Sequence, residues 1–389
     1  MCKSDLGLLL RYPLLSLSLL SKTQGQPLGY VEIRSITGLR AIAAMGVYCT
    51  HFGIPSWSPS WLKNIPLNGG LGVPFFFVLS GFVLTLAYEN RQMLPKKYAL
   101  DRFARIGPSY YLAFVLAIAY VSIPDGFDFN YVFVGHLFGL QSWFPTMDSG
   151  VSFNGPAWTI SVEMFLYAMF PILLRITSST GRLFSKWNFV FLGGLLISLI
   201  PFSIHLYFLV PLEGLHNTQV WTYLLPTHYL GLFIVGMSGC KARVDIRNFL
   251  AKWNLNGLVC DISIVLFGAA LLRFNFKDAN HPLLAMSTQF WLIGIPTVWV
   301  LVLLSTASSN SVFSWILQTR PFWFAGKISM VFYLVHVPTV WWVARLHPPA
   351  RYETKLLVTV LLSVFVHLLI ELPLNRKIRN GLFLHSKSA

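Results

Sequence analysis

Long apolar runs, separated by short polar stretches, repeat along most of the chain. From Thr37 onward these runs are about 17–22 residues long, and a helix of about 20 apolar residues crosses the hydrocarbon core of a bilayer. The pattern therefore predicts an all-α fold, a polytopic membrane bundle of about ten transmembrane helices. The predicted spans are Thr37–Ile54, Gly70–Tyr88, Gly107–Ile123, Ala157–Leu174, Asn188–Phe208, Val220–Gly239, Leu258–Leu272, Leu283–Leu304, Phe322–Ala344 and Leu356–Leu374.

Two segments fit this pattern less well. The predicted seventh span, Leu258–Leu272, is short and carries Asp261. A further apolar run, Tyr131–Trp143, is too short to cross a membrane and is expected to be re-entrant or to lie at the interface.

The distribution of basic residues orients the predicted spans. With the N-terminus inside, the inner loops and C-terminal tail hold seventeen Lys and Arg residues and the outer loops hold six. Cytoplasmic loops carry such an excess, so both termini are expected to be cytoplasmic. The inner basic residues are Arg91, Lys96, Lys97, Arg102, Arg105, Arg175, Arg182, Lys186, Lys241, Arg243, Arg247, Lys252, Arg320, Arg376, Lys377, Arg379 and Lys387.

Composition supports a membrane protein and changes the meaning of the net charge. Hydrophobic residues make up 55% of the 389 residues, charged residues only 11%, and the mean hydropathy is +0.62. Soluble domains carry about 25% charged residues. The formal net charge of +15 is then explained by loop topology, and no nucleic-acid partner is expected. The four cysteines have no metal-ligand spacing, so neither a metal site nor a disulfide framework is predicted.

The ends of the chain differ from its middle. The leucine-rich start is interrupted by Arg11 and Pro13, so residues 1–29 are expected to be an interfacial or disordered extension, although a signal peptide is an alternative. Residues 30–379 are expected to form the transmembrane domain, and residues 380–389 are expected to form a cytoplasmic tail.

Charged and imidazole side chains inside apolar spans mark candidate functional positions, because such groups normally face a bundle interior or a water-filled cavity. Arg40 and His51 are separated by eleven positions in the first span. At about 100° and 1.5 Å per residue, they lie on one helix stripe about 16.5 Å apart. Individually, Arg40 is typical of a snorkelling anchor and His51 of a hydrogen-bonded core histidine, but their shared face favours a functional pair.

Three more residues extend this candidate site. Glu163 in the fourth span and His51 have similar predicted depths, so the carboxylate is expected to orient the imidazole as a base. His336 lies in the outer half of the ninth span. Ser80 and Glu371 are interpreted structurally, the serine as a helix-packing residue and Glu371 as an ion-pair partner of Arg376 or Arg40.

Arg102 and Arg105 form an i, i+3 pair near the inner membrane surface. The composition alone leaves two interpretations equally open. The pair could anchor lipid headgroups, or it could clamp the phosphates of an anionic cytosolic cofactor.

These segments together resemble the acyltransferase 3 family of bacterial integral-membrane O-acyltransferases. The resemblance covers roughly residues 30–379 and rests on five motifs in order. They are Arg40 with His51, the Gly70–Phe82 segment containing FFVLSGF, RxxRIxPxY at Arg102–Tyr110, WTxxxE at Trp158–Glu163, and GxISxxxYLxH at Gly326–His336. Three positions depart from the family pattern, with Thr37 in place of an aspartate, Met330 in place of a tyrosine, and Leu372 in the closing ExP element.

The resemblance implies transfer of an acyl group, often acetyl from acetyl-CoA, to a hydroxyl of a cell-surface glycan such as exopolysaccharide or lipopolysaccharide. It implies a multi-pass protein of the inner (plasma) membrane, similar to family members without an appended soluble domain. Arg40, Arg102 and Arg105 would then bind acyl-CoA, with His51 as general base and Glu163 orienting it. His336 would stabilise the oxyanion, serve as an alternative base or carry the acyl group.

Other functions fit part of the same pattern. A transporter or flippase for a polysaccharide precursor also uses intramembrane charges and a cavity, although no inverted repeat relates the two halves. A non-enzymatic component of polysaccharide export is a third alternative.

Overall fold

The computed structural model describes residues 32–125, 130–144, 150–178, 186–204, 224–273, 294–306 and 311–385. Every regular element in these ranges is a helix, which confirms the predicted all-α class. The predicted N-terminal extension lies outside the described residues, as do parts of the predicted fifth, sixth and eighth spans.

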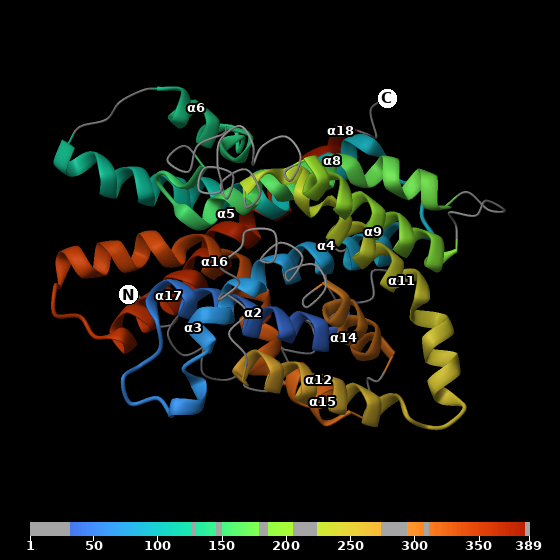
Figure 1. Cartoon of the computed structure of the whole chain (residues 1–389). Coiled ribbons are helices and arrows are strands. Elements are labelled where there is room, and N and C mark those ends of the chain that lie inside the picture. The colour runs from blue at the N-terminus through green and yellow to red at the C-terminus, as the bar shows by residue number, and fades with distance from the viewer. Residues whose placement is uncertain are drawn as a thin grey trace, which may run out of the picture.

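The helices pack side by side into one bundle, with α2 and α4 near its middle (Figure 1). The longer helices are α2 (Arg34–Phe52), α4 (Gly72–Tyr88), α5 (Pro95–Asp125), α8 (Trp158–Ser178), α9 (Trp187–Ile204), α11 (Leu230–Ala251), α12 (Asn256–Arg273), α14 (Ile295–Thr306), α16 (Arg320–Leu346), α17 (Tyr352–Val366) and α18 (Leu372–His385). Shorter ones are α3 (Ile65–Asn68), α6 (Tyr131–Leu137) and α15 (Val312–Gln318).

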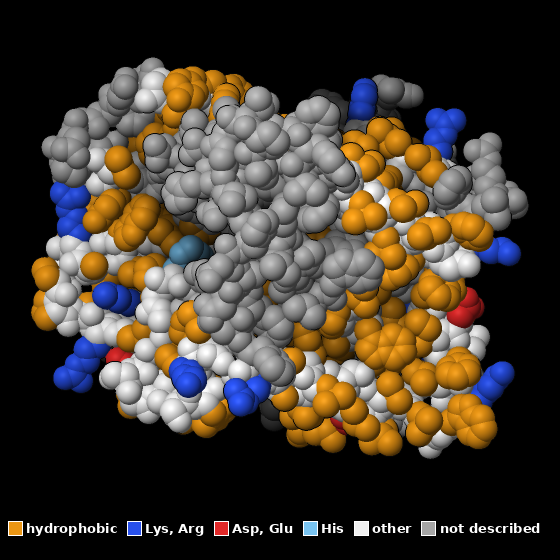
Figure 2. Space-filling view, in the orientation of Figure 1, with side chains coloured by type: hydrophobic (Ala, Val, Ile, Leu, Met, Phe, Trp, Pro, Cys, Tyr) orange, Lys and Arg blue, Asp and Glu red, His pale blue; other side chains and the backbone are white. Residues whose placement is uncertain are grey.

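Six segments of the described chain are long and apolar enough to cross a membrane. They are Ser60–Tyr88, Pro95–Val121, Gly155–Ser178, Asn256–Arg273, Arg320–Leu346 and Tyr352–Arg379. The other four predicted spans overlap helices α2, α9, α11 and α14. The number of ten spans and their orientation in the membrane stay predictions. On the face drawn in Figure 2, hydrophobic side chains cover most of the described surface and Lys and Arg gather toward its edges. The protein is a multi-pass membrane protein.

Glycines bring the backbones of α4 and α11 into direct contact. A Cβ atom added to Gly81 would collide with the Phe233 carbonyl, and one added to Gly236 would collide with the Val78 carbonyl. Small residues at such crossings allow the close packing that drives helix association in lipid. This contact fixes the position of α4, which forms one wall of the cavity described below.

Helices α2 and α16 run parallel along their length. Gly326 near the start of α16 lies against the Thr37 backbone, and further along, the Phe332 ring lies 5.6 Å from the Tyr48 ring. In the predicted layout, the first and ninth spans also cross the membrane in the same direction. The packing carries α16 past both Arg40 and His51 on α2.

The two segments that fitted the pattern poorly have local explanations. Asp261 of α12 accepts hydrogen bonds from the Val312 and Phe313 amides, at 2.9 and 3.1 Å, and so caps the start of α15. The run at Tyr131–Trp143 forms the seven-residue helix α6 and a single 3-10 turn, which are too short to span a bilayer.

Candidate active site

A cavity of about 420 Å³ lies between α2, α4, α5, α8 and α16. It runs along α4 from Val73, near the start of that helix, to Tyr88 at its end, and on to Gln92. At about 1.5 Å per residue, the stretch of α4 alone is about 22 Å long. The cavity is therefore an elongated passage through much of the bundle.

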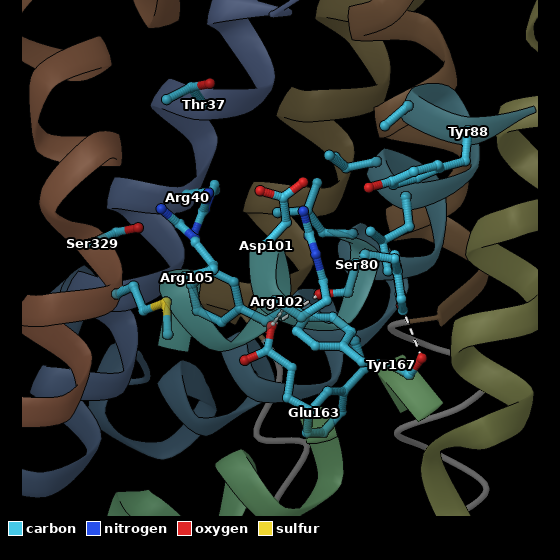
Figure 3. A pocket seen from close by; sticks show the side chains of 18 of the residues that line it. Thr37, Arg40, Ser80, Tyr88, Asp101, Arg102, Arg105, Glu163, Tyr167 and Ser329 are labelled. Carbon is cyan, nitrogen blue, oxygen red and sulfur yellow. Dashed lines mark hydrogen bonds between the residues drawn. The ribbon is translucent and has the colours of Figure 1, made fainter. Parts of the chain in front are cut away.

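The passage is strongly basic. Seven Lys and Arg residues line it against three acidic residues, Glu32, Asp101 and Glu163. The basic residues are Arg40, Arg91, Lys97, Arg102, Arg105, Lys327 and Arg379. All three arginines predicted to bind a cofactor thus line one cavity, and Figure 3 shows their side chains converging with that of Glu163. A lining of this charge suits an anionic ligand.

Arg102 is held by aromatic rings. Its guanidinium lies 5.5 Å from the Tyr167 ring centroid and 5.8 Å from that of Tyr98, within cation–π range. It makes no salt bridge in the described part of the chain, and its buried Nε has no hydrogen-bond partner there. Helix α5 begins at Pro95 rather than at the predicted Gly107, so the arginine lies inside the helix and turns toward the cavity.

Arg105, one turn further along α5, is held by a buried carboxylate. Its Nη1 lies 3.7 Å from Glu371, whose other oxygen lies 2.6 Å from Nδ1 of His367. Glu371 therefore has a structural role of the kind predicted, but its close partners are Arg105 and His367 rather than the predicted Arg376 or Arg40. His367 and Glu371 are the first and last residues of a π-helical turn between α17 and α18.

Glu163 has partners other than the predicted one. Its Oε1 accepts hydrogen bonds from the Tyr167 hydroxyl at 2.6 Å and from the Ser80 hydroxyl at 3.4 Å. His51 is not among the residues that line the cavity with Glu163. The hydrogen bonds of Glu163 are thus to Tyr167 and Ser80, and its predicted role in orienting His51 stays a prediction. A helical rise gives the depth of a residue but not the direction in which it points, and Glu163 points along α8 toward Tyr167.

His51 instead lies against His336. The two ring centroids are 5.2 Å apart, and the residue His51 is exposed whereas His336 is buried. The cavity ends close to this histidine pair, because Tyr333 lines the cavity and its ring lies 5.9 Å from that of His336. The sequence prediction did not anticipate that these two histidines meet.

Another acidic residue of the cavity lining, Glu32, was missed by the sequence analysis. Glu32 Oε1 accepts hydrogen bonds from Thr37 at 3.0 Å and Trp323 at 2.9 Å, and lies 2.7 Å from Nζ of Lys327. Burial alone would raise the pKa of Glu32, but the Lys327 charge and these hydrogen bonds outweigh burial and lower it. Glu32 precedes the first predicted span and no periodic signal marks it.

A smaller cavity of about 270 Å³ lies beside the first, between α5 and α8. Four residues, Tyr98, Arg102, Ile160 and Tyr167, line both. Arg102 is thus part of the wall between a basic passage and a mostly apolar one.

Comparison with known proteins gives partial matches to several acyltransferases. The chain is 31% identical to acyltransferase MdmB of Streptomyces mycarofaciens over 157 residues, 38% of this chain and 40% of that protein. It is 25% identical to the peptidoglycan O-acetyltransferase OatA of Listeria monocytogenes over 336 residues, 79% of this chain and 49% of that protein. It is 22% identical to O-acetyltransferase OatA of Staphylococcus aureus over 366 residues, 88% of this chain and 57% of that protein.

The chain thus spans about half the length of these curated relatives. No solved structure is similar to it. A family model described as an acyltransferase domain matches residues 33–375, which include every cavity and histidine residue discussed above except Glu32 and Arg379. The chain belongs to the acyltransferase 3 family.

Proposed function

We propose that the protein is a membrane O-acyltransferase that moves an acyl group, acetyl in the first instance, from acyl-CoA to a hydroxyl of a cell-surface glycan. The observation that supports this most directly is the basic passage, which leads from Gln92 and Arg91 at the end of α4 to the neighbourhood of His51 and His336. The similarity to a peptidoglycan O-acetyltransferase supports a glycan acceptor, and the similarity to a further O-acetyltransferase supports an acetyl group. Its site of action is the inner (plasma) membrane.

The basic lining fits the phosphates of the proposed donor. Arg102 has no carboxylate partner in the described chain and a buried donor atom without an acceptor, so it is available to a phosphate oxygen. Arg40 and Arg105 line the same passage. In this proposal the three arginines bind the phosphates of CoA, and the thioester arm extends along the passage toward Tyr333.

His51 acts as the general base. It takes the proton of the acceptor hydroxyl while the hydroxyl oxygen attacks the thioester carbonyl. The carbon–sulfur bond then breaks, and the proton passes from His51 to the departing thiolate. A positioned base of this kind contributes about 10²–10⁴ in rate. Glu163 is reassigned in this proposal, and it holds Tyr167 and Ser80 in the cavity wall.

The test uses the purified chain in liposomes with radiolabelled acetyl-CoA and candidate glycans. We expect label on a glycan with the native protein and a loss of about 100-fold or more with His51→Ala, at unchanged membrane insertion. A matched control is His347→Ala, which changes an exposed histidine beyond the end of α16. Label on no acceptor, together with uptake of a glycan precursor into vesicles, would support a transporter instead. Normal transfer by His51→Ala would remove His51 from the mechanism.

A further inference from the structure

The ring of His336 has a defined hydrogen-bonding state. Its Nδ1 lies 2.6 Å from the carbonyl oxygen of Tyr333, one turn earlier in α16. A carbonyl can only accept, so Nδ1 carries the proton and Nε2 of the neutral ring is an acceptor. This Nε2 is buried and has no hydrogen-bond partner among the described residues.

Aromatic rings surround this unused acceptor. Besides His51, the rings of Phe52, Tyr48, Tyr333 and Phe332 have centroids 5.9–6.3 Å from that of His336. No Asp or Glu side chain forms a recorded contact with His336 in the described part of the chain. Of the surrounding rings that carry a hydrogen-bond donor, that of His51 is nearest, with its centroid 5.2 Å from that of His336. Buried acceptors are normally paired, so an orphan beside a proposed base calls for an explanation.

We propose that His336 is a positioning residue for His51. In the reacting complex, Nε2 of His336 accepts the ring N–H of His51, which leaves the other nitrogen of His51 unprotonated and directed at the acceptor hydroxyl. This inference rests on the proposed function, because it assigns the partner of its base. It gives His336 the task that the sequence analysis gave to Glu163.

A neutral imidazole suits this task in a membrane protein. A buried carboxylate must lose its hydration, whereas the neutral ring brings no charge into the aromatic cluster. When His51 takes the proton of the acceptor, its N–H becomes the donor of a charge-assisted hydrogen bond, which is stronger than a neutral one. The contact therefore stabilises the transition state more than the ground state, which is the condition for raising kcat.

The experiment compares two variants of His336 with a matched control. His336→Phe keeps a ring in the cluster and removes the acceptor, so kcat is expected to fall about 10- to 100-fold with an unchanged KM for acetyl-CoA. His336→Gln restores an acceptor near the position of Nε2 and is expected to recover kcat to within about tenfold of native. The control is Thr339→Val, one turn away on α16, which removes another buried oxygen without a hydrogen-bond partner in the described chain and should leave kcat unchanged.

A double variant separates positioning from an independent catalytic role. If His336 acts through His51, adding His336→Phe to His51→Ala causes no further loss. An added loss would identify His336 as a base or acyl carrier in its own right and overturn the proposal. Failure of the glutamine variant to recover kcat, with insertion and thermal unfolding like native, would also overturn it. Absence of transfer by the native protein would instead refute the proposed function itself.

If His336→Phe does not insert, His336→Leu takes its place with the same expectations. A kcat that stays native in a folded variant without an acceptor would refute the positioning role while leaving the acyltransferase activity intact.

Discussion

Replacing Arg102 by glutamine tests whether the basic passage binds the donor through its phosphates. The guanidinium is positioned by two rings, at 5.5 and 5.8 Å, and makes no salt bridge in the described chain. A hydrogen bond to a charged group is worth about 1.5–3 kcal/mol. Its loss should raise the KM for acetyl-CoA about 10- to 150-fold, since each 1.4 kcal/mol is about tenfold.

The assay is steady-state transfer with two donors. Acetyl-CoA carries the phosphates and acetyl-pantetheine does not, so Arg102→Gln should raise the KM for the first donor only. Arg247→Gln is the matched control, because Arg247 is an exposed arginine of α11 outside the cavity lining. Thermal unfolding in detergent checks the cation–π contacts, whose loss should cost no more than about 2 kcal/mol.

Two outcomes would refute the reasoning. If a folded Arg102→Gln variant keeps its native KM for acetyl-CoA, Arg102 does not contact the phosphates. If the KM rises equally for both donors, the arginine shapes the passage and does not recognise phosphate.

Three further predictions concern the stability of the purified protein. Gly236→Ala should lower the free energy of unfolding by about 1–3 kcal/mol in denaturant titrations, because the added Cβ would meet the Val78 carbonyl. The control Gly268→Ala places its Cβ in open space and should not destabilise the protein. Equal losses in both variants would contradict the packing argument. Asp261→Ala should cost about 1–2 kcal/mol because the Val312 and Phe313 amides at the start of α15 lose their acceptor, while the N-cap Ser311 stays in place. Asp261→Asn should recover part of this loss, and the absence of any recovery would argue against this role of Asp261. Glu32→Gln should lower thermal stability at neutral pH. Because the pKa of Glu32 in the folded protein lies below its ordinary 4.5, the native protein should be more stable than the variant above pH 4.5, and the difference should disappear in stronger acid. A stability difference that grew on acidification would contradict the lowered pKa.

The sequence predicted the helical class from local signals, whereas a shared site for the three arginines was implied by the family resemblance. Apolar run length identifies helices, and charges inside those runs must face the bundle interior. Arg40, Arg102 and Arg105 come from two helices and nevertheless line one cavity. Only Arg40 lies inside a predicted span, whereas Arg102 and Arg105 precede the predicted third span, so the cost of placing charge in lipid accounts for Arg40 alone.

The partners of these residues could not be predicted in the same way. Whether Glu163 meets His51 or Tyr167 depends on the rotation of α8 relative to α2, and no periodicity within either helix fixes that rotation. Asp261 illustrates the same limit, since its role depends on α15, whose first residue lies 51 positions further along the chain. Contacts between distant segments arise from packing, which a single sequence does not display.

Helix α2 links the two ends of the site through an uninterrupted backbone, with Arg40 in the passage and His51 beside His336. A substitution between them changes one side chain, but inserting a single residue would swing the imidazole by about 100° relative to the guanidinium and lift it by about 1.5 Å. The ten intervening positions should therefore tolerate changes of identity far better than changes of number. A library with one-residue insertions and deletions in this stretch should lose activity almost throughout, whereas single replacements at its lipid-facing positions should be largely silent.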